Sequence, residues 1–121
     1  MFIRRSEQDF SICKVVDFSR IDIYGDLCFI AVTDEERSLV CPTKNVPDNT
    51  LKRDDGWKAF RIEGELDFSL VGILAGISGL LSENGIGLFA VSTYNTDYIL
   101  TKAENYERAL TVLSRNGYEI I

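Results

Sequence analysis

Alternating apolar and polar residues in the C-terminal half predict three strands, two of them in a hairpin. Residues 57–63, Trp-Lys-Ala-Phe-Arg-Ile-Glu, alternate as a half-buried strand does. Residues 88–92 predict a second strand, and residues 98–100 belong to a third. The stretch between them, residues 93–97, is polar and turn-prone, so we expect the second and third strands to form a β-hairpin.

A helix is predicted between the first two of these strands. Apolar residues recur at helical spacing from Leu70 to Leu81, and Asp67 or Ser69 can cap the start of the helix. Asn84-Gly85 supplies the stop signal, because glycine readily adopts the left-handed conformation that follows many helices.

Three glycines interrupt this helix near one face: Gly72, Gly76 and Gly79. Each interior glycine costs roughly 0.5–1 kcal/mol relative to alanine, so a reason for their presence is expected. A face without side chains lets a second helix, a symmetry-related copy or a ligand approach closely, and tight helix packing is the plainest of these readings. Gly72 is the best candidate for a ligand contact, because the first turn of a helix has free backbone N–H groups.

A second helix and a final short strand complete the C-terminal pattern. Thr101 is expected to begin the helix, since Glu104 three residues later completes a T-x-x-E capping box. Asn116-Gly117 is expected to end it, and residues 118–121 predict the strand. The resulting order, β-α-β-β-α-β, is a ferredoxin-like α+β unit in which helices cover one face of an antiparallel sheet.

The N-terminal half reads as a reduced, β-rich copy of this unit. Strands are expected near residues 10–16, 27–33 and 38–41. Shifted by 88 − 29 = 59 residues, Phe29–Thr33 falls on Leu88–Ser92. The connections are too short or too broken for full helices, and chance similarity between strands explains the offset about as well as a repeat.

Composition narrows the possible partners. The chain has 121 residues and a formal net charge of −6, which argues against nucleic acid and against an anionic membrane surface. No apolar run reaches the roughly 18 residues that span a bilayer, and the start of the chain lacks a signal-peptide pattern, so we expect a cytoplasmic protein.

The chemistry of a catalytic or metal site is missing from the sequence. There is no histidine, no phosphate-binding glycine motif, and no close cysteine pair among Cys13, Cys28 and Cys41, which we expect to be reduced and mostly buried. We therefore expect no catalytic residues, no metal and no cofactor. An enzyme using carboxylate chemistry is the least favoured of three functional hypotheses.

Several segments resemble the ACT domain, a regulatory module that binds free amino acids. Glu65–Leu74 resembles the joint between the first ACT strand and helix, and Glu83–Ile86 resembles the exit from that helix. Phe89–Leu100 resembles the hairpin of a subgroup of small tandem ACT-like proteins, related to aspartate kinase regulatory regions and cytosolic arginine sensors. Val40–Pro42 and Gly56–Lys58 also resemble this subgroup, which implies a degenerate ACT-like half in residues 1–56 and an ACT domain in residues 57–121.

The resemblance implies an amino-acid site between the turn before the first helix and the hairpin, often at an interface between ACT units. The helix N-terminus offers N–H donors for the ligand's carboxylate, and Asp97 offers a carboxylate for its ammonium. The expected ligand-binding residues are Ser69, Leu70, Gly72, Ile73, Leu74, Thr93, Tyr94, Asn95, Thr96 and Asp97.

Each of these residues also has a purely structural reading. Asp97 can cap the hairpin turn, Ser69 can cap the helix, and Thr93 and Asn95 are ordinary turn residues. Tyr94 can equally wall a pocket or stand exposed at the hairpin tip. The sequence thus favours an amino-acid sensor that forms a homodimer, with a ligand-free protein–protein interaction module of the same fold as the alternative.

Overall fold

The computed structural model describes residues 1–67 and 69–121, which form two compact units. The C-terminal unit comprises Met1–Glu7 and Lys58–Ile121, and the N-terminal unit comprises Gln8–Trp57. Strands β1 (Phe2–Val15) and β4 (Thr50–Ile62) contribute residues to both units. The predicted division after residue 56 into two ACT-like parts stays a prediction.

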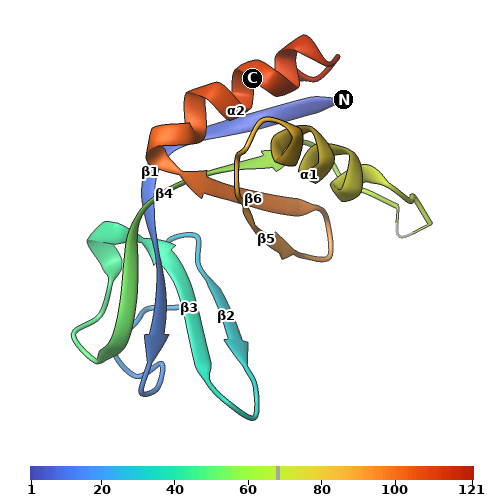
Figure 1. Cartoon of the computed structure of the whole chain (residues 1–121). Helices are drawn as coiled ribbons and strands as arrows, with labels where there is room; N and C mark the ends of the chain where they lie inside the picture. Colours follow the sequence, from blue (N-terminus) through green and yellow to red (C-terminus); the bar gives the residue numbers. More distant parts are fainter. Residues whose placement is uncertain (68) are drawn as a thin grey trace. The chain divides into compact units, whose positions relative to one another are not determined.

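The C-terminal unit has the predicted β-α-β-β-α-β order from β4 onward. In its sheet the strands are arranged β7-β1-β4-β6-β5, and both helices lie on one side of β6 (Figure 1). After β4 the elements are α1 (Ile73–Glu83), β5 (Phe89–Ser92), β6 (Asp97–Lys102), α2 (Ala103–Arg115) and β7 (Glu119–Ile120).

The beginning of β1 is part of the C-terminal sheet, which the sequence did not predict. Phe2 and Ile3 pair in parallel with Glu119 and Ile120, and the N–H of Glu63 donates to the carbonyl of Phe2 at 2.9 Å. The short final strand β7 is therefore paired with β1. The expected first strand near residues 10–16 was too short, because the polar stretch before it has no apolar periodicity to reveal a strand.

The core of the C-terminal unit lies between the sheet and the two helices. Tyr106 is its largest side chain and is 1% exposed; its hydroxyl donates to the carbonyl of Ala59 at 2.6 Å and accepts the N–H of Ser6 at 3.0 Å. Helix α2 is thereby tied to β4 and β1. The other buried members of the core are Ile3, Phe60, Ile62, Ile77, Leu81, Ile86, Ile99, Ala109, Leu110 and Leu113.

Both predicted helix starts were wrong. Helix α1 begins at Ile73, and its N-cap residue is Gly72, whose φ of 80° lies in the left-handed region. The carboxylate of Asp67 instead accepts the N–H of Ser69 at 2.8 Å in a local turn. Helix α2 begins at Ala103 without a side-chain cap among the described residues, so the capping box expected at Thr101 does not form.

The N-terminal unit is a small sheet with the strand order β2-β3-β1-β4. It contains β2 (Phe29–Val32), β3 (Arg37–Pro42) and a 3-10 turn at Thr43–Asn45. Its buried core consists of Cys13, Val15, Leu39 and Cys41. Residues 16–28 form turns and bends, so the connection that holds α1 in the C-terminal unit is irregular here.

The hairpins of the two units match closely. Val32 pairs with Arg37 at the end of the β2–β3 hairpin, and Ser92 pairs with Asp97 at the end of the β5–β6 hairpin. The offset is therefore 92 − 32 = 60 residues, one more than the sequence comparison indicated. Register is fixed by backbone pairing, and a one-residue error is easy to make between two apolar runs of similar composition.

Candidate functional site

A cavity of about 340 Å³ opens beside the N-terminal end of α1 and the β5–β6 turn. This volume is within the range of roughly 300–1,000 Å³ that is typical of small-molecule sites. All of the cavity wall belongs to the C-terminal unit. The wall is formed by Leu66, Asp67, Leu70, Gly72, Ile73, Leu74, Ala75, Ser92, Thr93, Tyr94, Asn95, Thr96 and Asp97.

The start of α1 contributes unpaired donors to this wall. The first bond of the helix runs from the N–H of Gly76 to the carbonyl of Gly72 at 2.9 Å. The preceding N–H groups, those of Ile73, Leu74 and Ala75, have no helical acceptor, as at the start of any α-helix. Gly72 has no side chain with which to cap them. These N–H groups and the positive end of the helix dipole make the α1 end of the cavity suitable for a carboxylate.

Two threonine hydroxyls in the wall are already used to hold the β5–β6 turn. Thr96 is 7% exposed, and its hydroxyl donates to the carbonyl of Ile62 at 2.8 Å. The hydroxyl of Thr93 donates to the carbonyl of Thr96 at 3.0 Å, and the N–H of Leu66 donates to the carbonyl of Asn95 at 2.7 Å. The turn is thus fixed against the segment that leads from β4 to α1, which shapes the cavity.

The matching turn of the N-terminal unit has the same bonds without α1. The N–H of Thr33 donates to the carbonyl of Glu36 at 2.9 Å, as the N–H of Thr93 does to that of Thr96 at 2.8 Å. The threonine bonding pattern is therefore a property of this turn and does not by itself indicate a ligand. The distinctive feature of the C-terminal turn is its position beside a helix N-terminus.

Two carboxylates, Asp67 and Asp97, lie in the wall. The N–H of Ser69 lowers the pKa of Asp67, so this carboxylate is charged at neutral pH. Asp97 is half-buried and accepts a hydrogen bond from the hydroxyl of Ser92. Because successive residues of a strand point to opposite faces, Asp97 shares its face of β6 with Ile99, which is buried under the helices.

The structure places the predicted site residues together with one exception. All of them except Ser69 line the cavity, and Ser69 donates its N–H to Asp67. Sequence reasoning missed Leu66, Asp67, Ala75 and Ser92 as wall residues. Ala75 would have followed from placing the helix start at Gly72, and Ser92 from the hairpin register. Ligand binding by any of these residues stays a prediction.

The glycine face of α1 does not pack against the rest of the chain. A Cβ atom at Gly72 or Gly79 would meet nothing within 4 Å among the described residues, and one at Gly76 would meet only the Tyr118 hydroxyl at 3.5 Å. Tight helix packing, which the sequence favoured as the explanation, is therefore wrong at Gly72 and Gly79. The face at Gly79 is open, whereas Gly72 is needed for its left-handed backbone.

The described residues show little that could support catalysis or metal binding. No group of three or more Cys, Asp or Glu side chains among them is arranged to hold a metal ion. Burial raises the pKa of the Cys41 thiol to about 12 and raises those of Cys13 and Cys28. These thiols stay protonated at neutral pH, where a thiolate would be the reactive form. In the described part of the chain, neither helix combines the length and apolar character that crossing a bilayer requires.

A family model described as ACT domain matches residues 52–115, more than half of the chain. A crystal structure of an Agrobacterium tumefaciens protein is similar over 99% of this chain and 91% of that one, with a TM-score of 0.83 and 27% identity. The regulatory subunit of Thermus thermophilus aspartate kinase matches with a TM-score of 0.60 and 11% identity, over 93% and 95% of the two chains.

The fold also recurs inside a larger enzyme. Clostridium acetobutylicum aspartate kinase, an allosteric enzyme, matches with a TM-score of 0.67 and 14% identity, over 92% of this chain but 33% of the kinase. No curated protein is similar enough in sequence to count as a match. The two aspartate kinase structures, at these identities, show the shared fold alone.

Proposed function

This chain belongs to the ACT domain family, and from that premise we propose that it is a regulatory module that senses a free amino acid in the cavity beside α1. The regulatory, ligand-binding role follows from the family. The amino acid as ligand, and the cavity as its site, are the parts that we propose.

One observation carries the proposal: the cavity wall joins helix N–H donors to carboxylates. An α-amino acid needs donors for its carboxylate and an anionic acceptor for its ammonium. The N–H groups of Ile73–Ala75 supply the first, and Asp67 or Asp97 supplies the second. Charge-assisted hydrogen bonds contribute about 1.5–3 kcal/mol each, so two of them with apolar contact to Ile73 support affinity in the micromolar to millimolar range.

We further propose that a second copy of the chain closes the site, giving a homodimer. The rim of the cavity exposes three apolar side chains, Leu70 at 52%, Val71 at 90% and Tyr94 at 73%. A group of exposed apolar residues around a polar cavity is typical of a surface that becomes covered. Because the ligand would be buried at this contact, binding and dimerisation would strengthen each other.

We also propose that residues 1–56 are a degenerate ACT-like half and that the protein acts in the cytoplasm. The matching hairpins at an offset of 92 − 32 = 60 residues support the first point. The net charge of −6 is compatible with the second.

The alternative is an interaction module that keeps the fold without a ligand. It is favoured by the turn itself, where the hydroxyls of Thr93 and Thr96 and one oxygen of Asp97 already have partners in the protein. In this case the apolar rim would bind a protein, and the cavity would be a consequence of the turn.

The two functions are separated by thermal unfolding with each of the twenty amino acids at millimolar concentration. A ligand that binds only the folded state, present at a hundred times its Kd, adds about 2.7 kcal/mol and raises the midpoint by several degrees. We expect one amino acid or a chemically related group to do so, and Asp97→Ala to abolish the shift relative to its own ligand-free midpoint.

The matched control is Asp34→Ala, the same substitution in the matching turn of the N-terminal unit. It should leave the ligand-induced shift intact. Sedimentation with and without the active amino acid would then show whether the dimer forms with the ligand. If none of the twenty shifts the midpoint, the sensor proposal is wrong and the interaction module becomes the better account.

A further inference from the structure

We propose that the ligand carries a second positive charge, on its side chain, so that the cavity selects a basic amino acid over neutral and acidic ones. This inference rests on the proposed function and specifies its ligand class. It comes from the charges of the cavity wall and from where the neighbouring arginines lie.

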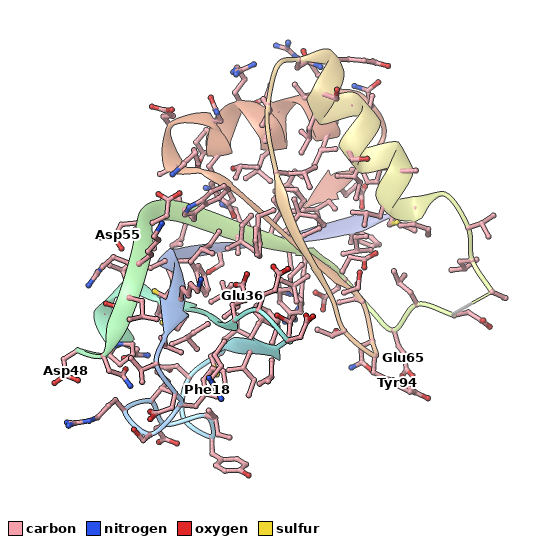
Figure 2. All side chains as sticks on the ribbon, turned by 60° about the horizontal axis from the view of Figure 1, so that its bottom comes forward. Phe18, Glu36, Asp48, Asp55, Glu65 and Tyr94 are labelled. Atoms are coloured by element: carbon pink, nitrogen blue, oxygen red, sulfur yellow. The ribbon has the colours of Figure 1, made fainter. Side chains whose placement is uncertain are left out.

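The wall is anionic. Asp67 and Asp97 reach it from two different segments, and none of the described residues that line it is lysine or arginine. A third carboxylate lies nearby: Figure 2 shows Glu65 and Tyr94 together at the tip of the hairpin, where the Leu66–Asn95 backbone bond joins the two segments. The positive end of the α1 dipole, worth about half a charge, offsets only part of this.

The nearest arginines are held on the other face of the sheet. Arg61 lies between Phe60 and Ile62, which are buried under the helices, so its side chain points away from the cavity side. It donates to Glu63 at 3.3 Å and to the Tyr98 hydroxyl at 3.5 Å. Arg4 also donates to Glu63, at 2.8 Å. These guanidinium groups have partners of their own and do not neutralise Asp97.

The charge balance then distinguishes ligand classes. The α-carboxylate of any amino acid can take the N–H groups at the start of α1, and its α-ammonium can take one of the two carboxylates. The other carboxylate is left facing the ligand side chain. A basic side chain pairs with it, a neutral one partly desolvates it without compensation, and an acidic one adds a repulsive charge.

The shape of the wall agrees with a basic side chain. Leu66, Ile73 and Leu74 supply apolar surface between the polar groups. The methylene stems of lysine, ornithine or arginine can lie along such a surface while the charged end reaches a carboxylate.

The test is isothermal titration calorimetry with pairs of ligands that differ in charge and little else: arginine against citrulline, and lysine against norleucine. We expect the basic member of each pair to bind at least about tenfold more tightly, the size of one charge-assisted hydrogen bond. The preference should weaken as salt is raised, because the paired groups are partly exposed.

Isosteric variants then assign the carboxylates. Asp67→Asn and Asp97→Asn should each weaken binding of the basic ligand, and one of them should bring the arginine-to-citrulline ratio close to one. Asp34→Asn, outside the cavity, should leave both the affinity and the ratio unchanged.

The outcomes separate this inference from the proposed function. Equal or tighter binding of citrulline and norleucine would overturn the selectivity and leave the amino-acid sensor standing. Binding of acidic amino acids would have the same meaning. If no amino acid binds, the proposed function fails and this inference fails with it.

Discussion

The same substitution at two glycines of α1 should change stability in opposite directions. In Gly79→Ala the new methyl group meets nothing within 4 Å among the described residues, and the backbone is helical. Alanine favours a helix interior over glycine by roughly 0.5–1 kcal/mol, so the variant should be more stable by about that amount.

In Gly72→Ala the new methyl group also has room, but the backbone does not suit it. Gly72 has a φ of 80°, and forcing a residue with a Cβ into this region costs about 1–2 kcal/mol. The variants should therefore differ by about 2 kcal/mol in unfolding free energy although neither creates a clash. Gly76→Ala is a further control and should gain stability, because its methyl group would only touch the Tyr118 hydroxyl at an ordinary 3.5 Å.

Urea unfolding at low protein concentration measures these differences, with thermal midpoints as a check; 1 kcal/mol corresponds to about 4 °C for a chain of this size. A loss of stability in Gly79→Ala would refute the reasoning. It would mean that another helix packs closely on the glycine face, and that the dimer contact includes this face of α1 as well as the cavity rim.

Two further predictions concern the buried groups of each unit. Tyr106→Phe should cost about 1–3 kcal/mol of unfolding free energy, because the hydroxyl bonded to Ala59 and Ser6 is lost from the core, whereas Tyr98→Phe should change it little; an equal effect would contradict the role given to Tyr106. Burial raises the pKa values of the thiols, that of Cys41 to about 12, so unfolded thiols ionise first and stability should fall from about pH 8.5 upward. Urea unfolding at pH 7.5 and 10 should show a smaller fall for Cys41→Ala than for the natural chain, and an unchanged fall would exclude this thiol as a cause.

The body of the C-terminal fold could be predicted from the sequence. The β5–β6 hairpin and the middle of both helices are marked by periodic apolar residues that must face one core, as Ile77, Leu81 and Ile99 do. Such patterns extend over many residues, so a single polar exception does not obscure them. The β-α-β-β-α-β order followed from them, and the family match supports it.

The parts that failed depend on backbone conformation or distant pairing. The start of α1 is set by the left-handed conformation of Gly72, while the sequence offered Asp67 and Ser69 as more obvious caps. The first residues of β1 are mostly charged or polar and form a strand because they pair with β7 from the other end of the chain. Neither fact leaves a local pattern in the sequence.

The candidate site was predictable as a location but not in its internal bonding. The hairpin and the helix start were both recognised by resemblance, and the bond between Leu66 and Asn95 brings them together. The engagement of Thr93 and Thr96 within the turn could not be read from residue types. It shifts the expected ligand contacts toward the helix N–H groups and the carboxylates.

The most direct test of the account is the amide spectrum of the ¹⁵N-labelled protein during titration with the amino acid that most raises its thermal midpoint. The account predicts that the largest shifts occur at Ile73, Leu74 and Ala75 and in the turn at residues 93–97, while the matching turn at residues 33–36 stays unchanged. Saturable shifts centred on the N-terminal unit, or equal small shifts throughout the chain, would contradict an amino-acid site at the start of α1.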